Sequence, residues 1–145
     1  MTPEKTTADR ELLRQWETCT LPFDQWTHRA HVKVAYLCLL EQPFDGALIR
    51  LRAGIKRYNG HNKIIESPTS GYNETTTHAF LHLIAAVRGA YGNTFPTESA
   101  DAFCDTHPQL MTRHILRLFY SPERRMDPRA KAEFVEPDLA PLPRI

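Results

Sequence analysis

The sequence predicts an all-α protein, a single compact bundle of about five to seven helices with an extended proline-rich C-terminal tail. Apolar residues recur at spacings of three and four along most of the chain, and no apolar–polar alternation of useful length for a strand occurs. Capping residues and prolines interrupt these stretches at helix-length intervals. Because 145 residues are enough for one hydrophobic core, residues 1–145 are predicted to form one domain.

The first two predicted helices cover residues 8–19 and 28–41. Thr6 or Thr7 is the expected N-cap of the first helix, because a hydroxyl oxygen accepts a hydrogen bond from an otherwise unpaired first-turn amide. Thr27 is the expected N-cap of the second. The second helix is apolar on nearly every side, which predicts that it lies at the centre of the bundle.

A third helix is predicted over residues 45–58 and a fourth over residues 74–90. The third carries a regular apolar stripe formed by Phe44, Leu48, Leu51, Ile55 and Tyr58. The segment 59–72 between these helices is the longest predicted loop. Loops of this length inside compact domains are often functional.

The C-terminal third of the chain is predicted to contain shorter helices. One covers residues 97–106, and the next follows an expected capping box at Thr106 and Gln109 and runs to about Phe119. Ser121, followed by a proline and an acid, begins a last short helix.

The tail, residues 135–145, is expected to be extended, because three prolines fall within its 11 residues. Its apolar side chains Val135, Leu139 and Leu142 are the expected anchors that pack it on the bundle.

Composition and charge exclude several classes of protein. The net charge is only +1, so no broad basic field is present to bind nucleic acid or an anionic membrane. The N-terminus has no apolar segment behind a basic start, and no apolar run approaches the ~20 residues that span a bilayer. The three cysteines are scattered and odd in number, which favours reduced thiols in a cytoplasmic protein.

Ionisable side chains gather at the start of two predicted helices. His28 and His31 are three residues apart and share a face of the helix over 28–41. Glu74 and His78 share a face of the helix over 74–90 in the same way. If the two faces converge, they form one cluster of imidazoles with a carboxylate.

Such a cluster suits two kinds of chemistry and one structural role. It would bind zinc, iron, nickel or copper with an open coordination position that acidifies a bound water. Without a metal, His and Glu are the usual general acids and bases. A structural role fits as well, because Asn73 is a good N-cap and Glu74 favours the positive end of a helix.

Four stretches of the chain resemble recurring blocks of a family of small, mostly uncharacterised bacterial proteins. They read "WTHRAHV" (26–32), "IKRYN" (55–59), "GYNETTT" (71–77) and "YSPERRMDPRAKAEFVEPDLAPLP" (120–143). The resemblance covers nearly the whole chain and implies that the blocks carry the site residues. Asn73 stands where the family pattern has His. If that His is a metal ligand, this chain lacks it, and His78 is the candidate replacement one turn further on.

We therefore expect a small-molecule-binding protein, interpreted as a small enzyme that uses a His/Glu cluster between the helices over 28–41 and 74–90. The expected catalytic residues are His31 as base or ligand, Glu74 as its partner carboxylate, and His28. The expected substrate-binding residues are Trp26, Arg57, Tyr58, Asn59, Tyr72, Asn73 and Thr77. Arg57 suggests an anionic group on the ligand, because its planar fork suits carboxylate or phosphate.

Two alternatives remain open at this point. The first is a metal-binding protein or metalloenzyme, whose divalent transition metal would be bound by His28, His31, Glu74 and His78. The second is a non-catalytic structural or interaction protein, in which the polar cluster ties the loop and the tail to the bundle. Neither the substrate nor the reaction follows from the sequence.

Overall fold

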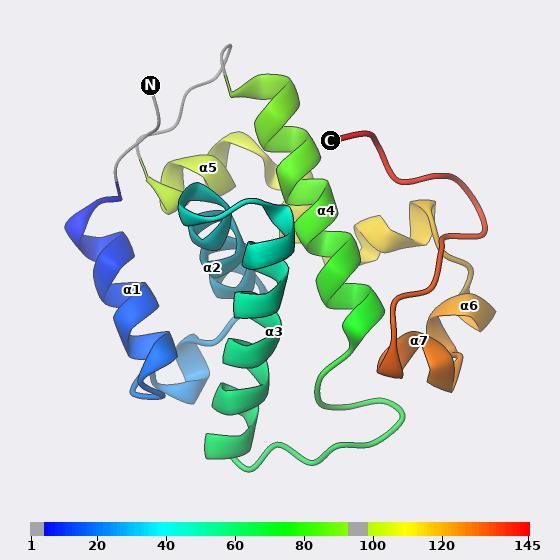
Figure 1. Ribbon diagram of the computed structural model, residues 1–145, viewed down its shortest axis with the longest axis horizontal. Coiled ribbons are helices and arrows are strands. Elements are labelled where there is room, and N and C mark those ends of the chain that lie inside the picture. The colour runs from blue at the N-terminus through cyan, green and yellow to red at the C-terminus, as the bar shows by residue number, and fades with distance from the viewer. Residues whose placement is uncertain (1–4, 93–98) are drawn as a thin grey trace.

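The computed structural model describes residues 5–92 and 99–145 and confirms the all-α fold (Figure 1). The α-helices are α1 (Thr7–Glu17), α2 (His28–Glu41), α3 (Phe44–His61), α4 (Glu74–Tyr91), α5 (Ala100–Thr106), α6 (Pro122–Met126) and α7 (Pro128–Ala132). Three 3-10 helices join them: η1 (Phe23–Gln25), η2 (Pro108–Met111) and η3 (Arg113–Leu118). None of the described helices is long and apolar enough to cross a membrane.

Helix α2 forms the centre of the bundle, as its apolar sequence predicts. It packs against α1, α3, α4 and α5, so neighbours cover it on most sides (Figure 1). Thr27 caps its first turn by accepting a hydrogen bond from the Ala30 amide at 3.2 Å. Of the two candidate N-caps of the first helix, Thr6 is the one observed, because it forms a capping box with Asp9 at the start of α1.

Helix α3 packs tightly against α1 at Gly54. The indole of Trp16, fully buried on α1, lies where a side chain at position 54 would project. A Cβ built on Gly54 would lie 2.1 Å from the Trp16 ring, which is far inside van der Waals contact. The absence of a side chain at position 54 therefore lets α1 approach α3.

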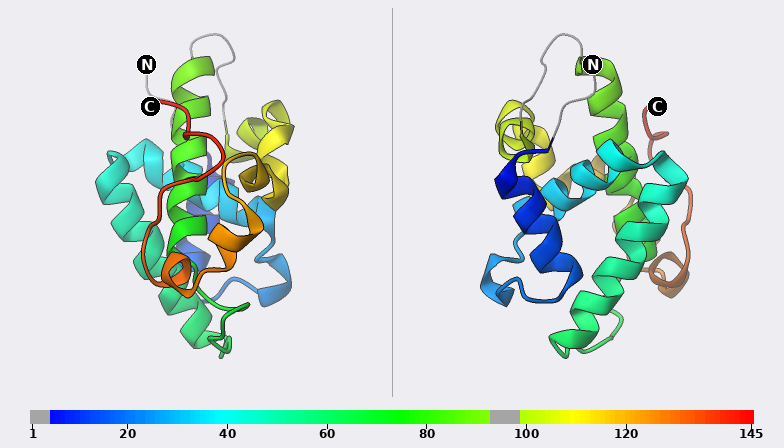
Figure 2. Two further views of the ribbon diagram at one scale, coloured as in Figure 1. Left: turned by 90° about the vertical axis from the view of Figure 1, so that its right-hand side faces the viewer. Right: turned by 60° about the vertical axis from the view of Figure 1, so that its left-hand side comes forward.

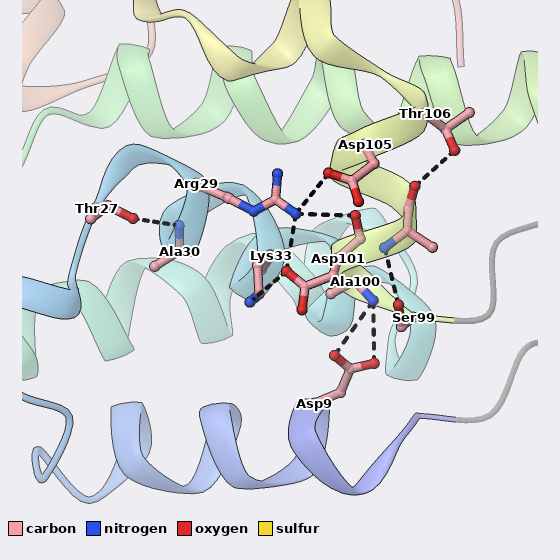
Figure 3. A network of polar contacts seen from close by, with 11 residues as sticks. Asp9, Thr27, Arg29, Ala30, Lys33, Ser99, Ala100, Asp101, Asp105 and Thr106 are labelled. Carbon is pink, nitrogen blue, oxygen red and sulfur yellow. Dashed lines mark hydrogen bonds and ion pairs between the residues drawn. The ribbon is translucent and has the colours of Figure 1, made fainter.

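Ion pairs and hydrogen bonds attach α5 to its neighbours (Figure 3). Arg29 of α2 donates to Asp101 and Asp105, each at 3.0 Å, and Lys33 donates to Asp101 at 3.0 Å. The buried carboxylate of Asp9 accepts a hydrogen bond from the Ala100 amide (Figure 3). The ion pairs with α2 and the hydrogen bond to Asp9 explain how a helix of only seven residues is held against α1 and α2.

Among the first four helices, the predicted C-terminal ends of α1 and α3 differ most from the observed ones. Helix α1 ends at Glu17 rather than at residue 19, because Thr18 is the C-cap and Cys19 has a positive φ of 59°. Helix α3 continues one turn beyond residue 58, so the loop before α4 shortens to residues 62–73.

The prediction of one α-helix from Thr106 to about Phe119 was wrong. The Thr106 hydroxyl donates to the Ala102 carbonyl at 2.7 Å and closes α5 instead of opening a new helix. The 3-10 helices η2 and η3 follow, and the extended Thr112 separates them. The last predicted helix begins at Ser121 as expected but is divided into α6 and α7 at Asp127. Residues 97 and 98 of the predicted helix 97–106 lie outside the described residues.

The C-terminal tail runs along α4 on the side away from α3 (Figure 2). The Val135 amide donates to the Thr75 hydroxyl at 3.2 Å, and its carbonyl accepts from the Tyr120 hydroxyl at 2.8 Å. Val135 is 5% exposed and Leu142 packs against the core, whereas Leu139 is 58% exposed. Leu139 is therefore not the apolar anchor that the sequence suggested, although its amide bonds the Phe119 carbonyl.

Substitution of Gly54 by Ala should destabilise the protein, because the new methyl group must displace the buried Trp16 ring. We expect a loss of about 1–3 kcal/mol, the usual cost of overpacking a core. Gly60→Ala is the matched control on the same helix, where a Cβ meets nothing within 4 Å. It should stabilise by up to about 1 kcal/mol through helix propensity. Urea unfolding of both variants measures the difference, and equal effects would contradict the Trp16 contact.

Val135→Ala should lower the melting temperature more than Leu139→Ala, because only Val135 is buried. Removal of two buried methyl groups costs about 1.5–2.5 kcal/mol, or roughly 5 °C for a domain of this size. The Leu139 variant should melt within about 1 °C of the wild type. Calorimetry checks both values, and a Val135 variant that melts like the wild type would mean that the tail is not part of the core.

Candidate functional site

A cavity of about 330 Å³ lies among α2, α3 and α4. Seven of the residues predicted from the sequence line it: Trp26, His28, His31, Asn59, Tyr72, Asn73 and Thr77. Its volume lies at the lower end of the range for small-molecule pockets, about 300–1,000 Å³. The stretches 26–32, 55–59 and 71–77 thus contribute to the wall of one cavity, whereas no residue of the fourth stretch, 120–143, lines it.

The cavity is apolar at one end and polar at the other. The apolar end is formed by buried side chains from the interior of the bundle: Val32, Ala35, Leu51, Ile55, Leu81 and Ile84. The polar end lies at the first turns of α2 and α4 and at the last turns of α3, and it includes the exposed residues Thr76 and Arg113. A ligand would therefore enter between polar groups and bury its apolar part.

His31 presents one ring nitrogen that is not used by the fold. Its Nδ1 lies 2.8 Å from the Thr27 carbonyl oxygen. Because a carbonyl only accepts, Nδ1 carries the proton and Nε2 keeps a lone pair. The ring stacks on Trp26 at a centroid distance of 3.8 Å, and Nε2 has no hydrogen-bond partner among the described residues.

The surroundings of His31 hold its imidazole in the neutral form. Burial is the main cause that lowers the pKa of His31 from 6.5 to about 4; the Thr27 hydrogen bond opposes this shift, and the charges of Arg113 and His28 add to it. Near neutral pH the lone pair on Nε2 is therefore available to accept a proton or a hydrogen bond.

His28 links the site to the segment that follows α5. Its Nε2 donates to the Leu110 carbonyl at 2.8 Å, and its ring meets Phe80 edge-on at 5.0 Å. Burial lowers the pKa of His28, so this imidazole is also neutral near pH 7. His28 lines the cavity, but its Nε2 is already hydrogen-bonded to Leu110 of η2.

Glu74 does not face His31 as the sequence analysis proposed. It is absent from the cavity wall, and Arg52 of α3 holds it with two hydrogen bonds of 2.8 Å. The Tyr72 hydroxyl donates to the same carboxylate at 2.8 Å. Burial opposes the charge of Glu74, but the Arg52 and Tyr72 hydrogen bonds together lower its pKa. Glu74 therefore positions Tyr72 and joins α3 to α4.

Tyr72 is also held through its backbone. Its amide donates to Glu66 at 3.0 Å, and Lys131 of α7 donates to the Tyr72 carbonyl at 2.6 Å and to Glu66 at 2.9 Å. The intervening Gly71 has a φ of 89°, a conformation that favours glycine. The loop before α4 thus presents Tyr72 as a fixed wall of the cavity.

Three further predicted site residues lie outside the cavity wall. Tyr58 is fully buried and donates to the Leu21 carbonyl at 2.7 Å, which makes it part of the core. Arg57 is exposed on α3. His78 stacks on Phe134 of the tail at 3.8 Å. The sequence carried two indications for Tyr58: the apolar stripe predicts a core residue, and the stretch 55–59 suggests a site residue. The structure agrees with the apolar stripe.

The four proposed metal ligands do not come together. His28 and His31 line the cavity, whereas Glu74 is paired with Arg52 and His78 lies against the tail. In residues 5–92 and 99–145, no group of three or more His, Cys, Asp or Glu side chains could hold a metal ion. Asn73 caps α4, since its side-chain oxygen accepts from the Thr76 amide at 2.9 Å.

Sequence reasoning missed Arg113 and the aromatic residues Phe23 and Phe80 in the cavity wall. Arg113 was placed within a continuous helix, where nothing distinguished it from the neighbouring Arg117. Its place in the wall depends on the 3-10 turns of η2 and η3, which bring a segment about 80 residues away in the chain to the first turn of α2.

Comparisons with models of protein families, with curated proteins and with solved structures found no match for this chain. The resemblance of its sequence blocks to a bacterial family therefore stays a prediction.

Glu74→Gln should destabilise the protein by about 1.5–3 kcal/mol, the usual value for hydrogen bonds to a charged group. Because the pKa of Glu74 is lowered on folding, its contribution is present above the unfolded pKa of 4.5 and is lost as pH falls below that value. The difference between wild type and variant should therefore shrink in acid. Glu133→Gln, which removes an exposed i,i+4 partner of Arg129, should cost under about 0.5 kcal/mol. Urea unfolding at pH 7 and pH 3.5 decides, and a difference that does not depend on pH would argue against the paired carboxylate.

Proposed function

We propose that this protein binds a small organic molecule in the cavity among α2, α3 and α4, and that it acts on this molecule as a small acid–base enzyme with His31 as the base. The observation that carries the proposal is the Nε2 lone pair of His31. It belongs to a neutral imidazole in the cavity wall and has no partner among the described residues.

The geometry around His31 supports a role in proton transfer. A general base must keep its lone pair free and its ring oriented. The Thr27 carbonyl and the stacked Trp26 ring fix the orientation of this imidazole. In catalytic histidines, a carbonyl or carboxylate bound to one ring nitrogen has the same effect. Asn59, Asn73 and Thr77 lie in the same wall and supply amide and hydroxyl groups that would orient a polar substituent. Glu74 has no part in the proposed chemistry, because its carboxylate accepts hydrogen bonds from Arg52 and Tyr72.

A pair of probe molecules tests the role of Nε2. The probes are 4-ethylphenol, which has an O–H donor, and 4-ethylanisole, in which a methyl group replaces the donor hydrogen. Methyl resonances of Val32, Leu51 and Ile84, which line the apolar end, report on occupancy of the cavity. The phenol should bind more tightly by about three- to tenfold, the effect of one hydrogen bond of about 1 kcal/mol.

His31→Leu should abolish the preference for the phenol while leaving the free energy of unfolding within about 1–2 kcal/mol of the wild type. The control is His114→Gln, because His114 is exposed and lies outside the cavity wall. If both probes leave the three methyl groups unshifted, the proposed function is contradicted. If His31→Leu retains the preference, His31 is not the acceptor.

The phenol preference should also depend on pH. Protonated His31 cannot accept a hydrogen bond, so the preference should persist from pH 8 down to pH 5 and disappear as pH falls through about 4. The groups that face the ring, Arg113 and His28, both oppose its protonation. A preference lost with a midpoint near 6.5 would show that the imidazole is not buried as described.

A further inference from the structure

Arg113 brings a permanent positive charge to the cavity wall. Among the described residues that line the cavity there is no carboxylate to neutralise it. Its guanidinium is near enough to His28 and His31 to oppose the protonation of both rings. Ion pairs hold Arg29, Arg50 and Arg52, whereas Arg113 forms none with any acid in the described parts of the chain.

The backbone around Arg113 is held firmly although its side chain is exposed. Arg113 is the first residue of η3, and Thr112 caps this helix by accepting from the His114 amide at 3.2 Å. On either side, Leu110 and Leu116 are buried in the core. The hydrogen bond from His28 to the Leu110 carbonyl joins the same segment to the first turn of α2. The backbone that carries Arg113 is therefore held beside the first turn of α2, at the polar end of the cavity.

The rest of the wall limits the size and kind of ligand. A cavity of about 330 Å³ accommodates roughly ten to fifteen non-hydrogen atoms at the packing density of a protein interior. Aromatic rings of Trp26, Tyr72 and Phe80 line the cavity. Rings of this kind pack well against a flat, ring-bearing ligand through stacked or edge-on contacts.

We propose that the ligand is a small monocarboxylic acid whose ring-bearing body fills the apolar end and whose carboxylate pairs with Arg113. This inference rests on the proposed function and names its substrate class. One guanidinium matches one carboxylate in charge and in its forked geometry. A phosphate ester is less well matched, because it carries nearly two charges and the described wall offers no lysine or second arginine.

The test compares 3-phenylpropanoate with 3-phenylpropanamide, which have the same shape and differ in charge. Binding to the full chain is measured by calorimetry at pH 7, and the methyl resonances of Val32 and Ile84 locate it. The acid should bind at least tenfold more tightly than the amide, and added salt should weaken only the acid. Arg113→Gln should remove this preference, while Arg117→Gln serves as the matched control on η3, because Arg117 is exposed and outside the cavity wall.

Each outcome bears on a different step. Loss of the acid preference in the Arg113 variant alone supports the assignment of the carboxylate to Arg113. Equal binding of acid and amide at the cavity, or equal effects of the two substitutions, overturns the assignment but leaves the proposed function standing. Binding of neither probe at the cavity contradicts the proposed function and the assignment together. Circular dichroism of both variants establishes that they are folded.

Discussion

The burial of α2 on most of its surface is the constraint on which the rest of the structure depends. A helix that is apolar nearly all round is stable in water only if other elements cover it, and here α1, α3, α4 and α5 do so. Its first turn, however, carries His28 and His31. Because the helix begins at the edge of the core, both imidazoles are partly buried. The packing of α3 and α4 around the same turn forms the cavity.

The electrostatics of the site follow from this position. His31 is partly desolvated, lies in the first turn of a helix, where the macrodipole is positive, and has Arg113 nearby. All three influences disfavour a positive charge on the ring, so the imidazole stays neutral. The same helix end and the same arginine favour a negative charge on whatever lies beside them. The neutral acceptor and the anion site that we propose would therefore both follow from one arrangement.

A separate set of polar contacts holds the wall of the cavity in shape. Arg52 of α3 binds Glu74 of α4, Glu74 binds the Tyr72 hydroxyl, and Lys131 of α7 binds Glu66 and the Tyr72 carbonyl. The contacts connect two long helices, the loop between them and the C-terminal region. This arrangement resembles the structural tie that the sequence left as an alternative, but among its side chains only Tyr72 lines the cavity.

The sequence alone determined the helical fold, the central place of α2 and the caps at Thr27 and Asn73, and it limited the cap of α1 to Thr6 or Thr7. These features depend on short-range periodicity and on hydrogen bonds within one turn. It also predicted His31 as a site residue, and His31 lines the cavity. Only the tertiary structure decided which charged groups meet. Glu74 pairs with Arg52 rather than His31, and Arg113, not Arg57, reaches the cavity. The physical reason is that a charged side chain has several partners within reach of its helix face. The choice among them depends on how the helices cross and on where η2 and η3 turn, neither of which local spacing encodes.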